Sequence, residues 1–150
     1  EILVTATGAD NNYFPRYSPD GRFIAYVHAV EPSRGAPSAE LRIIPATGGS
    51  PVVMRLASHR VGRTHDVPSL ANTMPAWGPA YDGIAWLTFS SIRPYGAVRP
   101  LTGPSQIWIS AIDLGVDGVD PSFPAVWLPG QDIGVLCNNP VWAVAPTRTE

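Results

Sequence analysis

The chain has 150 residues, the length of one ordinary domain, and a formal net charge of −2 at pH 7. That charge argues against a nucleic-acid-binding surface, which is normally clearly basic. The 17 prolines and 14 glycines leave little room for long helices, because proline removes a backbone donor and glycine weakens element interiors. With 45% apolar residues, the composition predicts a folded core of short strands joined by many turns. No apolar run approaches the roughly 18 residues of a membrane span.

Two stretches of the chain repeat one pattern, at residues 13–27 and 73–87. Each contains a proline, an aromatic residue two positions later, a second proline and Asp-Gly. A strand with the order Ile-Ala-aromatic follows, which aligns residues 24–26 with residues 84–86. A third start of the pattern appears at residues 139–146. Self-similarity at this spacing indicates a repeat protein.

In chain order, residues 2–8 match the last strand of a preceding repeat and its exit. The first complete repeat opens with a strand that ends at a tight turn, residues 18–21, where proline fixes φ and glycine accepts a positive φ. The equivalent turn of the second repeat is stretched to residues 78–83. The remaining strands are expected at residues 23–27, 40–44 and 51–56 of the first repeat and at 84–89, 106–112 and 124–128 of the second.

Four strands per repeat is the composition of one propeller blade. Both faces of the second strand are apolar in each repeat, at residues 23–27 and 84–89, as expected for a sheet covered on both sides. We therefore predict an all-β fold of four-stranded antiparallel blades. The aromatic residues at equivalent repeat positions, Tyr17, Trp77 and Trp142, are expected to pack within each blade.

The first repeat resembles the periplasmic TolB family of β-propellers. The resemblance lies in Pro-Arg-Tyr-Ser-Pro-Asp-Gly-Arg-Phe-Ile-Ala-Tyr at residues 15–26 and in the Ala-Thr-Gly-Gly-Ser-Pro turn at residues 46–51. The second repeat departs from that pattern, with long loops at 90–105 and 113–123. It is closer to a divergent, uncharacterised bacterial branch of this superfamily, through its Trp-Leu-Thr-Phe-Ser-Ser strand at residues 86–91.

The repeats divide the chain into four parts: the end of a preceding blade (1–11), a first repeat (12–72), a second repeat (73–137) and the start of a third (138–150). This amounts to an incomplete arc of about two to three blades, whereas a closed propeller needs roughly four to eight. We therefore expect a longer polypeptide, or other chains, to complete the ring.

Two polar segments were weighed as metal sites. His59, His65 and Asp66 share one loop, but their spacing does not place them on one strand or helix face. The acidic turn at residues 113–120 offers several carboxylates to calcium, although its spacing is not that of an EF-hand. The prediction is no metal or cofactor, with calcium at the acidic turn as the alternative.

Nothing in the sequence forms a catalytic pattern. Ser90 and Ser91 follow a strand without an adjacent base, and the nucleophile elbow Gly-X-Ser-X-Gly is missing. Cys137, the single cysteine, has no basic partner nearby in sequence to make it a thiolate. We therefore predict that the chain is not an enzyme.

The strongest partner-binding segment is the loop at residues 91–105. It carries Arg93, Tyr95 and Arg99, and tyrosine and arginine are favoured in binding hot spots. Loops on a rigid scaffold also carry function more often than the scaffold strands do.

The resemblance to TolB implies a non-catalytic protein-binding or scaffold module, located in the periplasm or outside the cell. Protein partners are expected, including chains that complete the ring, and no nucleic acid or membrane span. The alternative is an accessory or gating propeller of a larger hydrolase, such as a prolyl-oligopeptidase-like enzyme. A sugar-binding propeller that uses exposed tryptophans is a weaker alternative.

Overall fold

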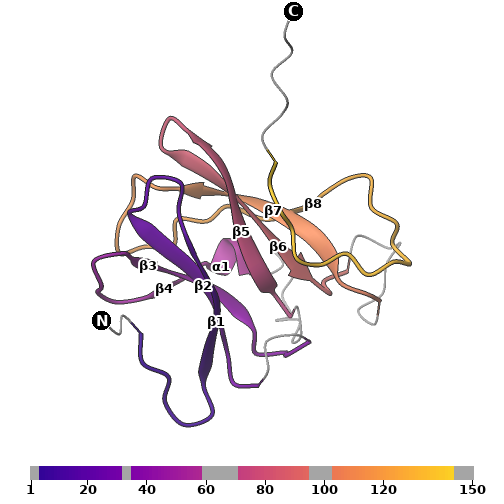
Figure 1. Ribbon diagram of the computed structural model, residues 1–150, viewed down its shortest axis with the longest axis horizontal. Helices are drawn as coiled ribbons and strands as arrows, with labels where there is room; N and C mark the ends of the chain where they lie inside the picture. Colours follow the sequence, from indigo (N-terminus) through magenta and orange to yellow (C-terminus); the bar gives the residue numbers. More distant parts are fainter. Residues whose placement is uncertain (1–3, 32–34, 59–70, 95–102, 144–150) are drawn as a thin grey trace, which may run out of the picture.

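The computed structural model describes residues 4–31, 35–58, 71–94 and 103–143, and these form an all-β chain with two four-stranded antiparallel sheets (Figure 1). Each sheet is a simple meander in which neighbours in sequence are neighbours in space. The first sheet contains β1 (Asn11–Tyr17), β2 (Phe23–Ala29), β3 (Glu40–Pro45) and β4 (Val52–Val53). A one-turn helix, α1 (Arg55–Ser58), follows it. The second sheet contains β5 (Thr73–Tyr81), β6 (Ile84–Ser91), β7 (Gln106–Asp113) and β8 (Val126–Trp127). The predicted all-β class is thus confirmed.

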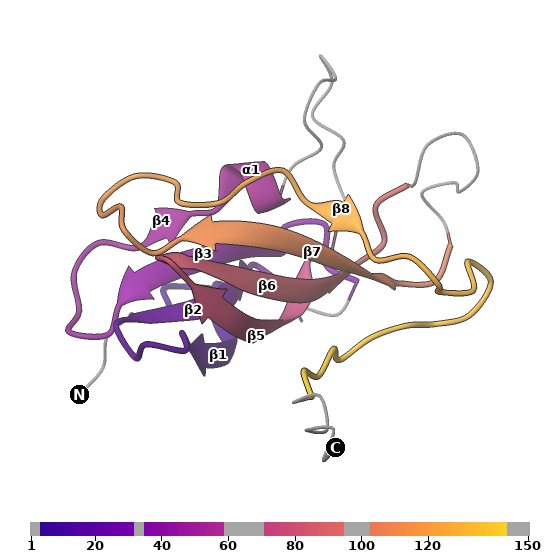
Figure 2. The same ribbon diagram turned by 90° about the horizontal axis from the view of Figure 1, so that it is seen from above.

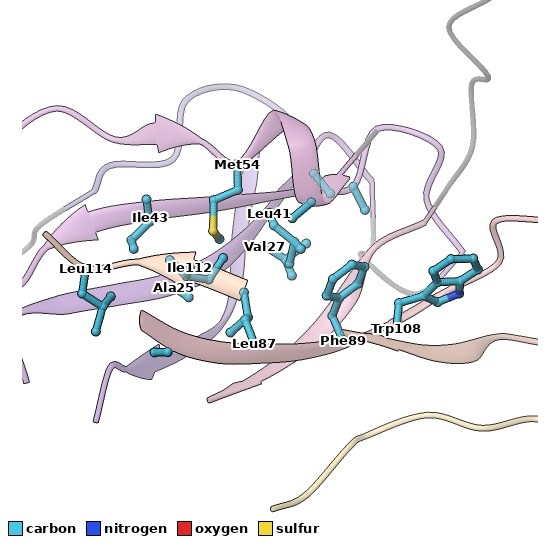
Figure 3. Packing of buried hydrophobic residues seen from close by; sticks show 14 of the residues in the cluster. Ala25, Val27, Leu41, Ile43, Met54, Leu87, Phe89, Trp108, Ile112 and Leu114 are labelled. Atoms are coloured by element: carbon cyan, nitrogen blue, oxygen red, sulfur yellow. The ribbon is translucent and has the colours of Figure 1, made fainter. Parts of the chain in front are cut away.

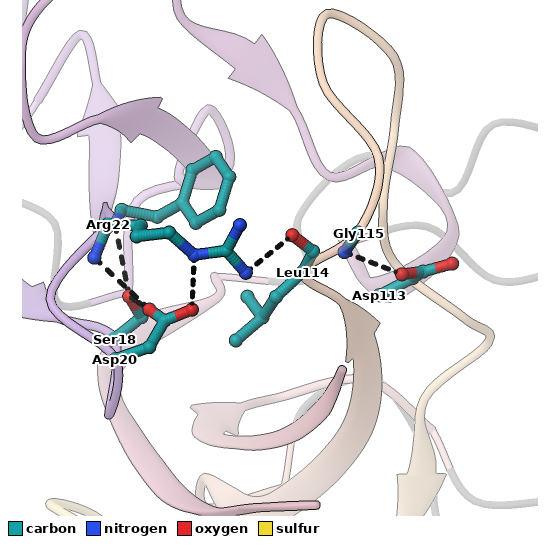
Figure 4. A network of polar contacts seen from close by, with 7 residues as sticks. Ser18, Asp20, Arg22, Asp113, Leu114 and Gly115 are labelled. Carbon is teal, nitrogen blue, oxygen red and sulfur yellow. Dashed lines mark hydrogen bonds and ion pairs between the residues drawn. The ribbon is translucent and has the colours of Figure 1, made fainter. Parts of the chain in front are cut away.

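The turn between β1 and β2 has the predicted chemistry. Gly21 has a φ of 72° and its N–H donates to the Ser18 carbonyl at 2.9 Å. Asp20 organises the turn by accepting from the Ser18 hydroxyl at 2.6 Å and from Arg22 Nε at 2.7 Å (Figure 4). Desolvation by burial tends to raise the pKa of Asp20, but these hydrogen bonds and the Arg22 charge outweigh it and hold the pKa below 3.8.

The second repeat does not have the stretched turn predicted from its sequence. Instead, β5 continues to Tyr81, and only Asp82 and Gly83 connect it to β6. Both have a positive φ, 48° and 79°. A two-residue Asp-Gly connection with positive φ at both positions matches the right-handed twist of a hairpin, so the strands extend up to it.

Three further expectations are corrected by the structure. Residues 4–8 form no strand. The expected strand at 51–56 is only two residues long, because Arg55 and Leu56 enter α1. Tyr17 does not pack within its sheet but is 64% exposed.

The main core lies between the two sheets (Figures 2 and 3). The first sheet contributes small and aliphatic side chains, with Met54 between the sheets. The second contributes larger ones, among them Leu87, Phe89 and Trp108. Trp108 belongs to this core, and the partly buried Trp127 packs against it. A second, smaller cluster covers the other face of the first sheet and contains Ile24, Tyr26 and Ile44, packed against Val4 and Ala46. Both faces of β2 are therefore covered.

The pairing registers of the two sheets match from residue 13 to 17 of β1 and from residue 73 to 77 of β5, and β5 then has one additional register shift between Trp77 and Ala80. In each sheet, the residues paired between neighbouring strands line up as a row of four residues, one from each strand. The corresponding rows are Arg16–Ala25–Ile43–Val52 in the first sheet and Ala76–Thr88–Ile109–Val126 in the second. Ala25 therefore corresponds to Thr88. The alignment of residues 24–26 with 84–86 was wrong by three positions, and residues 87–89 are their counterparts.

This correspondence shows how the sheets are stacked. Ala25 and Ile43 face the second sheet and lie in the core between the sheets. Their counterparts, Thr88 and Ile109, lie on the opposite side from Leu87 and Phe89, because side chains alternate along a strand. The sheets thus contact each other through non-equivalent faces, head to tail. Equivalent faces would meet in a two-fold sandwich.

Candidate interaction surfaces

Arg93 joins the two repeats from the interior of the chain. It is only 2% exposed. Its Nη2 atom donates to the carbonyl oxygens of Ala57 at 2.7 Å and Ser58 at 3.2 Å, and to Asn72 Oδ1 at 2.7 Å. These three acceptors belong to the end of the first repeat. Asn72 also donates its side-chain amide N–H to the Ser58 carbonyl at 3.0 Å, so Asn72 and Arg93 share that acceptor.

Aromatic rings of the second repeat cover the guanidinium group of Arg93. Its carbon lies 5.0 Å from the centre of the Phe89 ring and 4.9 Å from that of Trp108. Such contacts are attractive because a cation is drawn to the face of an aromatic ring. Burial lowers the pKa of Arg93 to about 9, which leaves it charged at neutral pH. Arg93 therefore holds the exit of the first repeat against the second sheet.

Of the three predicted partner-binding residues, the structure describes only Arg93. Arg93 is an interior residue, not a surface contact, because the backbone carbonyls around α1 occupy its guanidinium. Tyr95 and Arg99 lie outside the described residues. Arg93 nevertheless fixes the start of the loop that carries them. No sequence pattern indicates this role, since the acceptors come from a distant part of the chain.

The acidic turn proposed as an alternative calcium site makes contacts within the chain. Asp120 Oδ2 accepts from the Leu56 N–H at 3.0 Å, and Ser122 Oγ accepts from the Ala57 N–H at 3.0 Å. Asp113 Oδ1 accepts from the Gly115 N–H at 2.8 Å (Figure 4). Among the described residues, no three side chains of His, Cys, Asp or Glu are grouped to hold a metal ion. His59, His65 and Asp66 lie outside that part of the chain.

A further polar contact ties the two repeats together beside that turn. Arg22 Nη2 donates to the Leu114 carbonyl at 3.0 Å, across from the first sheet to the end of β7 (Figure 4). The same side chain pairs with Asp20. The turn that carries the family resemblance therefore also contacts the neighbouring repeat.

The outer face of the second sheet exposes apolar side chains. We define this outer face by Thr88, Ser90, Ile107, Ile109, Val126 and Leu128. Val126 is 59% exposed and Leu128 37%. In the first sheet, the counterpart of Val126 is Val52, which packs against the core between the sheets. Within the part of the chain that the structure describes, the second sheet near β8 thus lacks the cover that its counterpart has.

Trp142 covers the other part of the outer face. Residues 129–143 run from β8 back across the second sheet (Figure 2). Trp142 Nε1 donates to Thr88 Oγ1 at 3.0 Å. Its ring also occupies the space beside Gly78, where a Cβ atom would lie 2.7 Å from Trp142 Cδ2 and closer to two other ring atoms. Only glycine fits at this position while Trp142 stays in place.

The starts of the three repeats surround one open hollow of about 440 Å³. Its walls come from equivalent segments of the chain, which are residues 14–17, 74–77 and 139–142. The residue before the proline has the same unusual backbone in each, with φ values of 53° at Phe14, 52° at Met74 and 53° at Asn139. A positive φ is uncommon outside glycine, so its recurrence marks a shared local structure.

Comparisons with family models, with curated proteins and with solved structures found no match to this chain. No helix among the described residues is both long and apolar enough to span a membrane. The resemblance to the TolB family therefore stays a prediction that rests on the sequence motifs.

Proposed function

We propose that the chain is an arc of a TolB-like β-propeller and acts as a non-catalytic protein-binding or scaffold module of the cell envelope or of an exported complex. The observation that carries the proposal is the head-to-tail stacking of two sheets with matching registers. Head-to-tail contacts between like units generate rings when the rotation closes. A propeller is such a ring, built from four-stranded sheets.

The open hollow supports the same arrangement. In a propeller, the first strands of the blades surround a central channel. Here β1, β5 and residues 139–142 contribute equivalent segments to one hollow. β1 also lies directly against β5. Trp77 Nε1 on β5 donates to the Arg16 carbonyl on β1 at 2.9 Å, which fixes the two first strands relative to each other.

The binding role is assigned to the loop that starts at Arg93. A binding loop works best when its base is rigid, because less conformational entropy is lost on binding. The buried hydrogen bonds of Arg93 provide such a base. Tyr95 and Arg99 follow it in sequence and supply the side-chain types favoured at binding hot spots.

The test is to isolate the natural protein from its own cells together with bound proteins, as the wild type and as the Tyr95→Ala/Arg99→Ala variant. We expect this variant to bind its partner at least about 30-fold more weakly, the effect of a hot spot of about 2 kcal/mol. Tyr81→Ala is the matched control, since Tyr81 is 87% exposed on the β5–β6 hairpin, at the opposite end of β6 from Ser91. Equal retention by both variants would exclude the loop as the binding site. A hydrolase domain encoded beside this sequence would favour the accessory-propeller alternative instead.

A further inference from the structure

We infer that the outer face of the second sheet docks a third four-stranded sheet of the same register, whose first strand includes residues 139–142. This inference rests on the proposed propeller arc and names the partner of its open face. The docked sheet would present a row of large apolar side chains, as the second sheet does to the first.

The outer face has a covered counterpart in the first sheet. Leu128 and Met54 are equivalent, because each donates its N–H to the matching carbonyl, that of Ile107 at 3.1 Å and that of Leu41 at 3.0 Å. Met54 is fully buried between the sheets, whereas Leu128 is 37% exposed. The same position is thus covered in one sheet and open in the other.

The covered face of the first sheet and the outer face of the second sheet share a pattern of side-chain sizes. On the covered face of the first sheet, β2 carries the small Ala25, and β3 and β4 carry aliphatic residues. On the second sheet, β6 carries the small polar Thr88 and Ser90, with Trp86 at the position that corresponds to Phe23. Aliphatic residues follow on β7 and β8. The matched pairs are Ala25 and Thr88, Val27 and Ser90, Leu41 and Ile107, Ile43 and Ile109, and Val52 and Val126.

Small residues on the central strand leave room for large side chains from the facing sheet, since well-packed layers set large against small. In the existing interface, Leu87, Phe89 and Trp108 fill that room. On the outer face, Thr88 and Ser90 are already buried by the chain itself, and Val126 and Leu128 are the part that remains exposed. The outer face therefore fits a sheet that sets large apolar residues against Val126 and Leu128.

Trp142 already anchors the start of the third repeat on the second sheet. Trp77 Nε1 donates to the carbonyl of Arg16 in the preceding repeat at 2.9 Å. Trp142 Nε1 reaches the equivalent carbonyl, that of Ala76, through one hydroxyl, because Thr88 Oγ1 donates to Ala76 at 3.0 Å. With the shared positive φ before the proline, this puts residues 139–142 where the first strand of a third sheet belongs.

The position of Trp142 also distinguishes between two possible occupants of the outer face, a second copy of this chain and a sheet that continues from Trp142 itself. In a second copy of this chain docked on the outer face, Tyr17 would be the counterpart of Trp77. It would therefore have to take the place that Trp142 already fills beside Gly78. A sheet that continues from Trp142 meets no such conflict and leaves Val126 and Leu128 to its remaining strands.

Photo-crosslinking in the producing cell tests the inference on the whole natural protein. p-Benzoylphenylalanine replaces Val126 in one variant and Tyr81 in a control. Both side chains are exposed, but Val126 lies on β8 within the outer face, whereas Tyr81 lies at the tip of the β5–β6 hairpin. We expect the Val126 probe to crosslink to a strand of another four-stranded repeat. A crosslink to the first sheet of a second copy, a crosslink to an unrelated protein, or no crosslink would each overturn the inference.

Cysteine labelling gives a second, independent measurement. In a Cys137→Ser background, Val126→Cys and Tyr81→Cys are labelled in the native protein, each relative to its own rate in urea. The exposures of 59% and 87% by themselves predict a difference below twofold. With a docked sheet, we expect Val126→Cys to react at least tenfold more slowly than Tyr81→Cys, and equal rates would refute the docking. Such a failure would leave the loop experiment at Tyr95 and Arg99 unaffected, so the two proposals fail separately.

Discussion

Replacing Gly78 by alanine should displace Trp142 and destabilise the protein. The backbone of Gly78 is not in the left-handed region, so alanine by itself would stabilise by about 0.4–1 kcal/mol through the unfolded state. Against this, the new Cβ would collide with the Trp142 ring. Trp142 is 38% exposed, and covering most of an indole contributes up to about 3 kcal/mol. Its hydrogen bond to Thr88 contributes about 1 kcal/mol more. Because a displaced ring keeps part of its contacts, we expect a net loss of about 2 kcal/mol.

The assay is urea unfolding followed by far-ultraviolet circular dichroism, on the wild type, Gly78→Ala, Trp142→Ala and the double variant. With Trp142 removed, Gly78→Ala should become neutral or stabilise by up to about 1 kcal/mol. The coupling free energy between the two positions should then be about 2–3 kcal/mol, the upper range for residues in direct contact. An equal effect of Gly78→Ala in both backgrounds would refute the reasoning, because the cost would then not come from Trp142.

Two further predictions concern buried and turn contacts. Arg93→Met should lower the free energy of unfolding by about 3–5 kcal/mol in urea, since it leaves buried acceptors at Ala57 and Asn72 unsatisfied. Arg93→Lys should lose less, and a loss below about 1 kcal/mol for Arg93→Met would contradict the anchoring role. Because the folded pKa of Asp20 lies below 3.8, its stabilisation, under about 1 kcal/mol, should be present above pH 3.8 and disappear as the pH falls through the folded pKa. Asp20→Asn should remove this part of the decrease in the free energy of unfolding at acid pH. If the free energy of unfolding of Asp20→Asn depends on pH as that of the wild type does, Asp20 does not contribute in this way.

The local chemistry of the sequence was sufficient for the fold class and for much of the first repeat. Proline and glycine placed the turn at residues 18–21, and the apolar residues on both faces of β2 indicated a sheet covered on two sides. The structure confirms both features. These predictions succeed because they depend on neighbours in the sequence, where proline and glycine restrict φ and side chains alternate along a strand.

The place of Arg93 could not be read from the sequence. Its side-chain type and its loop suggested a surface contact, yet its acceptors are backbone carbonyls at Ala57 and Ser58, more than 30 positions away. Backbone groups carry no sequence signal, so only the folded chain shows that they converge on one guanidinium.

The recurring segments that begin at residues 13, 73 and 139 were determined by the sequence, because the prolines and aromatic residues recur there. Which residues of the two sheets are equivalent was decided only by the tertiary structure. The matching Ile-Ala-aromatic letters aligned Ala25 with Ala85. The hydrogen-bond registers of the two sheets instead make Thr88 the equivalent of Ala25. A shift by an odd number of residues moves every side chain to the other face of the sheet. The register therefore determines that the sheets stack head to tail and that the face around Val126 is the open one.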